Sequence, residues 1–583
     1  MYRGLISTSL FLISFHLLIL SQPKPRVDFS GNYFFDKNEL LSATSAIPAD
    51  NFIKWADSLT SVVARLYFDN GFLDCDLTRE TEFLNDTIPV LLKLNIKEGD
   101  RYSIKVVNIA GDDSSFSGST GELTRKLEGS DFSSLSLQKY IAELIELYEN
   151  SGHPFIKVVV ESVVRDTSEE QSLFVNIRIE KGAPYNIDRI VIKGNENTAD
   201  YVIIREIDLV PGEKFSEQKI NSIPLKLNRL RFFDPVQIPD YYLDSRGQGV
   251  LEIKVVERKV NNFDGIVGFI PPSNDEEKGY FTGLVTVSIK NLFGTGRGTL
   301  LRWQKIDRLS NELEFNYYEP RVFGFRLNAG GGFFQKKQDS IYIQNKVDLF
   351  AEFPATDEIF FLLQFSRESL IPSILEVPIF TVYNSDQNTF SAGLKIDTRD
   401  DPLSPTKGSF FQTTFGSSQK GINGPAEYLT PEMPREYFIK RITLNLNLFY
   451  SLFPRQVAML GINGKHIEGG LVEVSDLYKF GGTRSLRGYR ENQFFGSVIG
   501  WSNFEYRFLL TRRSFAFLFY DLGFYKRDRN DKLKITGAEE AKSGYGFGLN
   551  LETGVGVLNV SYALAKGETF NQGKIHFGII NDF

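Results

Sequence analysis

Cysteine and histidine are scarce in this sequence, and their scarcity excludes several kinds of site. Cys75 is the single cysteine among 583 residues, so neither an intramolecular disulfide nor a cysteine-ligated metal cluster can form. Of the four histidines, His16 lies in the N-terminal segment, and His153, His466 and His576 are scattered and predicted to be packing or surface residues. We therefore predict no metal site and no cofactor.

Long apolar runs are also missing beyond the N-terminus. Arg3 followed by the apolar residues 5–20 predicts a signal peptide at residues 1–21, with a short single anchor as the alternative. No later segment approaches the ~20 consecutive apolar residues that a membrane helix needs. An exported protein of this kind is periplasmic, secreted or a membrane β-barrel.

Two further absences narrow the function. The net charge of −7 argues against nucleic acid as a partner, because binding phosphates needs a concentrated basic surface. No Gly-x-Ser-x-Gly nucleophile motif occurs, and the glycine-rich residues 294–298 lack the lysine of a phosphate-binding loop. We predict that the protein is not an enzyme.

The first half of the chain repeats a short pattern three times. A β-like run closes at a glycine in each copy, at Gly31, Gly111 and Gly194, which are 80 and 83 residues apart. Each copy continues with helical periodicity, which in two copies ends at a C-cap glycine (Gly71 and Gly152), and closes with two strand-like runs. Each copy is therefore predicted to be a small β-α-α-β-β domain. These domains could be spacers, or their sheet edges could accept extended client segments.

The second half, from about Asn262, alternates apolar and polar residues. We count sixteen such segments up to Phe583, joined alternately by short turns and by longer loops, notably at residues 417–436, 471–496 and 526–542. Short turns on one rim and long loops on the other are typical of outer-membrane barrels, whose charged residues line the lumen. A large soluble β-sandwich is the alternative, because alternation does not show which face is buried.

One loop segment combines glycines with three arginines, Gly-Gly-Thr-Arg-Ser-Leu-Arg-Gly-Tyr-Arg at residues 481–490. With Arg487-Gly488-Tyr489 at its tip, it resembles the lumen-inserted sixth extracellular loop of the BamA/TamA superfamily. Residues 503–507 and 519–523 resemble the two strands that follow in that family, and the terminal Phe583 resembles its assembly signal. No single motif is specific, but their ordered combination is, and the resemblance covers nearly the whole mature chain.

The resemblance implies an α+β chain in two parts. Three periplasmic POTRA-like β-α-α-β-β domains (residues 25–101, 102–184 and 185–260) would precede a 16-stranded antiparallel transmembrane β-barrel (residues 262–583). The expected location is the bacterial outer membrane, with the repeats in the periplasm.

The residues of the loop and its strands agree with this placement. Lipid cannot host Glu505 and Asp521 cheaply, so both should point into the lumen. Arg487 on an entering loop would reach Asp521 with Glu505 nearby, and its guanidinium would pair with a carboxylate through a fork that lysine cannot reproduce. Gly488 and its neighbours permit a tight backbone course. The pair could merely fix the loop or could tune gating, and we favour a structural pin with functional consequences.

The function implied by the resemblance is assembly or translocation of outer-membrane proteins. Gly265 and Gly268 weaken the first barrel strand, and Gly578 lies in the last strand, which ends at Phe583. A poorly paired seam between the two strands would expose edges that template a client strand. The expected partners are unfolded outer-membrane or secreted proteins, the lipid bilayer and an accessory envelope subunit, but no nucleic acid.

Two other functions remain as alternatives. A two-partner-type secretion pore resembles the same superfamily, although such pores normally carry two repeats and an N-terminal plug helix. A passive structural surface protein is the third hypothesis. A stable wide conductance would favour the pore, and depletion without loss of other outer-membrane proteins would favour the passive role.

Overall fold

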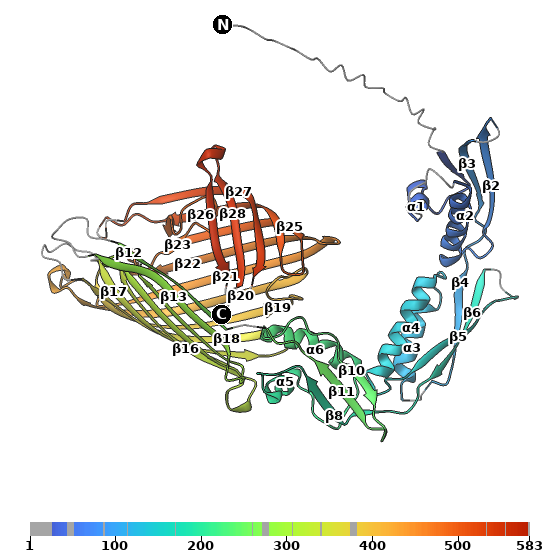
Figure 1. Cartoon of the computed structure of the whole chain (residues 1–583), viewed down its shortest axis with the longest axis horizontal. Helices are drawn as coiled ribbons and strands as arrows, with labels where there is room; N and C mark the ends of the chain where they lie inside the picture. The colour runs from blue at the N-terminus through green and yellow to red at the C-terminus, as the bar shows by residue number, and fades with distance from the viewer. Residues whose placement is uncertain are drawn as a thin grey trace, which may run out of the picture. The chain divides into compact units, whose positions relative to one another are not determined.

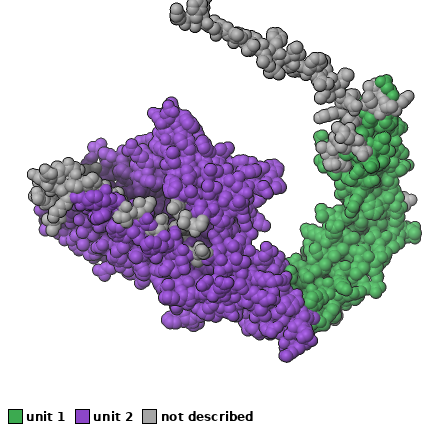
Figure 2. Space-filling view, in the orientation of Figure 1, with its two compact units in different colours: residues 1–186, 214–218 green, residues 187–213, 219–583 purple. Residues whose placement is uncertain are grey.

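The structure is a computed structural model that describes residues 26–43, 52–85, 88–112, 115–168, 171–258, 261–270, 279–305, 307–338, 341–373, 382–531, 533, 535–553 and 556–580. The signal peptide predicted at residues 1–21 lies outside these residues, as does Phe583. In the described part, every helix is too short or too polar to cross a membrane. The chain forms two compact units, one of residues 1–186 with 214–218 and one of residues 187–213 with 219–583 (Figure 2).

The first repeat is a three-stranded sheet covered by helices (Figure 1). Its elements are β1 (Arg26–Ser30), α1 (Lys37–Ser42), α2 (Phe52–Asp69), β2 (Asp76–Leu84) and β3 (Ile88–Lys97). The strand order is β1-β3-β2, with β1 parallel and β2 antiparallel to β3. Leu59 and Val63, one turn apart on α2, are fully buried, and so are Leu92 and Leu94 on the inner face of β3.

The second and third repeats follow the same plan. The second contains β4 (Ser103–Ala110), α3 (Ser117–Leu127), α4 (Ser134–Glu149), β5 (Lys157–Arg165) and β6 (Ser172–Glu180), in the sheet order β4-β6-β5. The third contains β7 (Asn186–Ile187), β8 (Arg189–Lys193), α5 (Asp200–Ile207), β9 (Glu213–Lys214), α6 (Glu217–Leu230), β10 (Asp240–Leu243) and β11 (Gly249–Lys254), in the order β10-β11-β8.

The repeated glycines follow the first strand of each repeat sheet. Gly31, Gly111 and Gly194 have φ of 76°, 82° and 90°, which L side chains rarely adopt. A Cβ at these positions would lie 2.0, 2.3 and 2.0 Å from the backbone carbonyl oxygens of Ile96, Ile179 and Val255, respectively. Each of these partners lies at or beside the end of the last strand of the same repeat. The glycine period found in the sequence therefore marks one close approach between two backbone segments, made once in each repeat.

The second half folds into one antiparallel sheet of sixteen strands, each paired with its neighbours in sequence order (Figure 1). The strands are β12 (Asn262–Ile270), β13 (Tyr280–Leu292), β14 (Arg297–Lys305), β15 (Asn311–Glu319), β16 (Asn328–Gln338), β17 (Tyr342–Pro354), β18 (Ile359–Pro372), β19 (Asn384–Asp397), β20 (Gly408–Gly424), β21 (Glu436–Phe453), β22 (Gln456–Gly469), β25 (Val498–Leu509), β26 (Phe515–Arg527), β27 (Ala538–Thr553), β28 (Gly556–Ala565) and β29 (Lys574–Ile580). Short 3-10 helices η1 (Val322–Gly324), η2 (Ala426–Tyr428) and η3 (Phe570–Gln572) occur in the connections. Among the described residues, no register joins β12 to β29, so closure of the barrel through that pair stays a prediction.

The two faces of this sheet differ in the sense expected for a membrane barrel. On β26, the outward side chains Leu518, Tyr520 and Leu522 are 61%, 46% and 50% exposed. Between them, Phe519 is 5% exposed and Asp521 is fully buried. A soluble β-sandwich would bury its apolar face and expose its charges. The observed orientation instead suits a polar interior and a surrounding hydrocarbon solvent.

Two predicted loops are shorter than the sequence pattern indicated. Residues 417–424 belong to β20 and not to a loop, and residues 526–542 lose both ends to β26 and β27. On the extension of β20, Ser418, Lys420 and Ile422 alternate inward and are 1%, 2% and 4% exposed. Lys420 stays buried because it meets carboxylates of another loop, a contact that the local pattern could not show.

Candidate functional site

The candidate site is the long loop between β22 and β25, which folds back against the inward face of the sheet. Its stem is a small hairpin of β23 (Tyr478–Phe480) and β24 (Phe494–Gly496), paired antiparallel. Its tip, residues 481–490, carries the arginine motif, and Leu486 in the tip is fully buried. Phe480, Phe494 and Tyr525 pack around the stem, with ring centroids 5.3 to 5.9 Å apart. The loop is therefore packed within the structure instead of projecting into solvent.

Arg487 at the tip binds two strands at once. Its Nε and Nη2 donate to the two carboxylate oxygens of Asp521 at 2.8 and 2.7 Å, which is a bidentate fork. Its Nη1 donates to Glu505 at 2.7 Å, and its backbone N–H donates to Asp521 at 3.0 Å. The structure thus brings the three predicted charged residues together, with β25 supplying Glu505 and β26 supplying Asp521.

These charges are enclosed by protein. Arg487, Glu505 and Asp521 are only 6%, 8% and 0% exposed. The guanidinium also lies over the ring of Phe519, 3.7 Å from its centroid. A buried charge is tolerated only with a well-placed partner, and removing one partner typically costs ~3–5 kcal/mol. The cluster therefore fixes the loop strongly and specifies where its tip must lie.

Neighbouring polar groups complete the hydrogen bonding of the cluster. Asn503 donates to Asp521 at 2.8 Å and to the Ser485 carbonyl at 2.8 Å. Arg507 pairs with the second oxygen of Glu505 at 2.8 Å and lies 4.6 Å from the ring centroid of Phe515. Asn503, Glu505 and Arg507 share one face of β25, as the alternation predicts.

The glycines of the loop allow backbone approaches that a side chain would block. Gly488 has φ of 91°, and a Cβ there would lie 2.8 Å from the backbone of Leu564 and Ala565 on β28. From β27, Gly544 would place a Cβ 1.9 Å from the Arg487 carbonyl oxygen. Tyr489, after Gly488, donates from its hydroxyl to the Ser543 carbonyl of β27 at 3.1 Å. The tip thus lies directly against the C-terminal strands.

A second charged cluster, which sequence reasoning missed, fixes the start of the same loop. Lys420 of β20 donates to Glu473 and to Asp476, each at 2.7 Å, and Lys420 and Glu473 are both only 2% exposed. Arg441 of β21 adds a contact to Asp476 at 3.3 Å. The loop is therefore pinned by buried ion pairs at its start and at its tip. In the sequence, the one sign of this second cluster was Lys420 itself, a lysine at an inward-facing position of an alternating segment.

The third repeat meets the turns at one rim of the sheet. The turn after β13 lies against the loop before α5, since Asn291 donates to Thr198 at 2.8 Å and Ala199 donates its N–H to the Gly294 carbonyl at 3.0 Å. A Cβ on Gly294 would lie 2.0 Å from the Asn197 carbonyl oxygen. This contact explains why the glycine-rich residues 294–298 begin with a glycine that no larger residue could replace.

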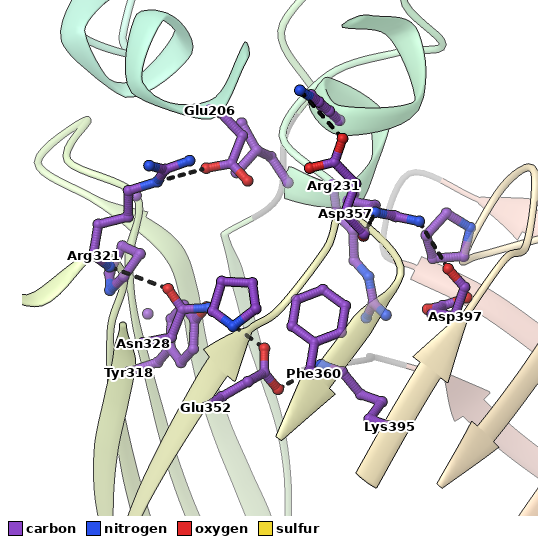
Figure 3. A pocket seen from close by; sticks show the side chains of 18 of the residues that line it. Glu206, Arg231, Tyr318, Arg321, Asn328, Glu352, Asp357, Phe360, Lys395 and Asp397 are labelled. Atoms are coloured by element: carbon purple, nitrogen blue, oxygen red, sulfur yellow. Dashed lines mark hydrogen bonds and ion pairs between the residues drawn. The ribbon is translucent and has the colours of Figure 1, made fainter. Parts of the chain in front are cut away.

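A cavity of about 480 Å³ lies between this repeat and the rim (Figure 3). Glu206 of α5 is 3.7 Å from Arg321, and Lys226 of α6 is 3.2 Å from Asp357. Burial raises the pKa of Glu206, against the opposing charge of Arg321. Arg229 of α6 donates to the Asp397 carbonyl at 2.7 Å. Two ion pairs thus connect helices of the repeat to the turns after β15 and β17, and a hydrogen bond to a backbone carbonyl connects α6 to the end of β19.

The predicted seam residues fall at the two ends of the sheet. Gly265 and Gly268 lie on β12, and Gly578 lies on β29, while Phe583 is outside the described residues. A Cβ on Gly578 would lie 3.6 Å from the Thr483 methyl of the interior loop. Gly578 lies against the loop, and in the part of the chain that the structure describes no register pairs it with β12.

Comparisons with known proteins agree with this architecture. Residues 291–583 match the Omp85 superfamily domain, and residues 185–258 match the POTRA surface antigen variable number repeat. The outer membrane protein assembly factor BamA of Neorickettsia risticii (strain Illinois) is 24% identical over 545 residues, which cover 90% of this chain and 71% of that protein. BamA of Nitratidesulfovibrio vulgaris (strain Hildenborough) is 21% identical over 559 residues, which cover 89% of this chain and 66% of that protein.

A solved structure extends the likeness to the fold. The structure of CdiB from Escherichia coli covers 92% of this chain and 99% of its own, with a TM-score of 0.50 and 12% sequence identity. Identity this low shows the fold alone. The superfamily match spans half of the sequence and contains the interior loop with both of its acidic partner strands. The protein belongs to the Omp85 superfamily.

Proposed function

We propose that this protein is an outer-membrane protein assembly factor. Its periplasmic repeats would receive unfolded clients, and the seam between β12 and β29 would pass them laterally into the membrane. The observation that carries the proposal is the colinear match to BamA over 90% of the chain, through the repeats and the barrel together. The protein would act by templating strands, without a catalysed covalent step.

The repeats offer edges suited to extended clients. β5 lies at the edge of its sheet, where one side of its backbone has no strand partner among the described residues. Val159, Val163 and Val164 on this strand are 45%, 40% and 49% exposed. Exposed apolar side chains on an unpaired edge favour strand addition by another chain, because main-chain hydrogen bonds and apolar contacts form together.

The seam has the weak ends that lateral insertion needs. β12 contains Gly265 and Gly268, and glycine weakens strands because it adds no side-chain packing. β29 is short, and its outward residues Ile575 and Phe577 are 75% and 62% exposed, as expected of a strand facing hydrocarbon. A client strand would pair with one of these edges while the opposite edge separates.

Locking the seam tests the proposal. Cysteine pairs placed between residues 263–269 and 574–578, in a Cys75→Ala background, should abolish insertion of a urea-unfolded outer-membrane barrel into proteoliposomes. Thr414→Cys with Thr443→Cys is a matched control, since these hydroxyls are in contact across the stable β20–β21 pair. The control disulfide should leave insertion unchanged. Undiminished insertion by the seam-locked protein would refute the lateral route.

Conductance separates this function from a secretion pore. The interior loop packs against the inward face of β25 to β28 and is held there by buried ion pairs. In a closed barrel it would fill part of the lumen, so planar-bilayer recordings should show a mostly closed barrel. A stable wide conductance in the wild-type protein would instead favour secretion of a partner protein.

A further inference from the structure

The interior loop contacts the last strand of the sheet as well as the strands that carry its acidic partners. The Gly488 N–H donates to His576 Nε2 of β29 at 3.0 Å. The Thr483 hydroxyl lies 3.4 Å from His576 Nδ1, and the Thr483 methyl faces Gly578. His576 and Gly578 are two residues apart, so they share the inward face of β29. Thr483 and Gly488 of the arginine motif thus both contact β29.

The hydrogen bonds define the form of the imidazole. Nε2 can accept from Gly488 only if it carries no proton, so the proton of the neutral ring lies on Nδ1, facing Thr483. His576 is 7% exposed, and the charged groups acting on it are Arg487 and Glu491 from the loop, Asp521 from β26 and Lys574 from its own strand. A second proton would remove the acceptor that Gly488 uses.

β29 is also held by its pairing with β28 and by the ion pair of Lys574 with Glu568 at 2.6 Å. Among the described residues its single strand neighbour is β28, to which it pairs from Lys574 to Ile580. Its outward side chains face the membrane, and its inward His576 and Gly578 meet the loop. The loop in turn is fixed to β25 and β26 through Arg487. β12, at the other end of the sheet, has β13 as its single strand neighbour among the described residues.

We propose that His576 is a positioning residue that clamps the interior loop to β29, so that the loop and strands β25 to β29 form one body. Resting on the proposed function, this clamp holds β29 in place at its end of the seam while a client enters. Sequence reasoning assigned His576 to packing or surface, because nothing near it in sequence shows the loop that it meets.

Amide hydrogen exchange of the full-length protein in lipid nanodiscs tests the clamp directly. His576→Leu removes the acceptor and should speed exchange of residues 574–580 about tenfold, the usual effect of losing one buried hydrogen bond. His576→Gln offers an amide oxygen near the position of Nε2 and should restore protection. Peptides from β16 and β17 serve as the internal control.

These results can contradict the clamp in two ways. Equal exchange of β29 in the wild type and His576→Leu would show that the imidazole does not hold the strand. A His576→Gln protein that exchanges as fast as His576→Leu would show that ring packing matters and the acceptor does not. Folding of His576→Leu is judged by its heat-modifiable electrophoretic mobility. If this variant does not fold, a cysteine pair between the loop and β29 tests the clamp instead.

That pair is Thr483→Cys with Gly578→Cys in a Cys75→Ala background. The Thr483 methyl and the Cβ position of Gly578 are 3.6 Å apart, which is close enough for a disulfide to form with little movement. If the loop and β29 move together, the oxidised pair should insert clients as well as its reduced form does. Loss of insertion on oxidation would overturn the clamp.

The two proposals fail in different experiments. If the β12–β29 lock leaves insertion intact, the lateral route is wrong, but the exchange pattern of β29 still reports on the clamp. If the β12–β29 lock abolishes insertion and the Thr483–Gly578 lock does so too, the lateral route stands and the clamp is wrong.

Discussion

Phe68 of α2 in the first repeat and Phe547 of β27 in the barrel sheet are equally exposed, at 52% each. Around Phe68 the repeat keeps its aliphatic side chains inside, with Leu59, Leu92 and Leu94 fully buried. Around Phe547 the order is reversed, because apolar side chains face outward and Asp521 lies inside. Equal exposure therefore means contact with water in one region and with hydrocarbon in the other.

Ion pairs show the same reversal. Arg165 and Asp74 in the repeats form a pair whose side chains are 51% and 47% exposed, while the Arg487 and Asp521 side chains are 7% and 0% exposed. Exposed pairs contribute little to stability, since water competes for both partners. Enclosed pairs decide which conformation is allowed, because an unpaired buried charge is costly. In the repeats this ion pair lies at the surface, whereas beside the barrel sheet the buried ion pair determines where the loop lies.

The largest effect is expected at the enclosed pair. Arg487→Ala leaves Asp521 and Glu505 buried without their cation, which should cost ~3–5 kcal/mol in the stability of the loop position. Limited proteolysis in detergent should then cut within residues 481–490. Arg484→Ala is the matched control, since Arg484 is an exposed arginine of the same loop and should change nothing. Equal protection of both variants would contradict the pin.

The repeat core should respond to a cavity. Leu94→Ala removes a fully buried side chain of β3 and should cost ~2–5 kcal/mol, because the lost contacts are replaced by a void. Urea unfolding followed by helical circular dichroism reports on the three repeats together, since the long helices of the described residues lie in the repeats. Insertion of a client in the absence of urea should change less than the urea midpoint does. An unchanged urea midpoint would contradict the core assignment.

The two equally exposed phenylalanines offer a direct comparison of solvents. Phe547→Arg places a charge toward hydrocarbon and should cost ~2–4 kcal/mol near the membrane midplane, whereas Phe68→Arg faces water and should be nearly neutral. Urea titration of both proteins in lipid vesicles measures the difference. Equal effects of the two substitutions would show that the outward face of β27 does not contact lipid.

The smallest expected effect concerns a carboxyl in the second repeat. Burial, aided by Glu217 and Glu146, raises the pKa of Glu149 to about 7 from a usual 4.5. The stability that this group contributes is present below pH 4.5 and is lost as the pH rises toward 7. Glu149→Gln should therefore stabilise the repeats by ~1 kcal/mol above neutral pH, an amount reduced by partial exposure, and change little at pH 4. Urea midpoints at both pH values measure this difference, and an equal gain at pH 4 would contradict it.

The sequence was sufficient to predict those features whose physical cause lies within a few residues along the chain. The repeated glycines, the helix-terminating Gly71 and Gly152, and the alternation on β25 and β26 all follow from geometry within a few residues. The third repeat has no glycine at the corresponding helix end, and Arg231 takes a positive φ of 63° there instead. A search of the sequence for glycines therefore misses the end of this helix.

Contacts between distant segments could not be predicted in the same way. Lys420 meets Glu473 across 53 residues, and Gly488 meets His576 across 88. Glu206 approaches Arg321, a residue of a rim turn, only because the third repeat docks there. Such pairs depend on which strands become neighbours of the loop, and alternation says nothing about that. The Arg487 cluster was accessible because family resemblance supplied the missing neighbour.

The enclosed position of the arginine motif also constrains the order in which the molecule can be built. The motif sits against Gly544 of β27 and against the backbone of β28, and its hairpin stem is packed around Phe480 and Phe494. The contacts with β27 and β28 can form only once these strands have arrived. Docking of the loop and pairing of the C-terminal strands are therefore coupled steps in the folding of this sheet.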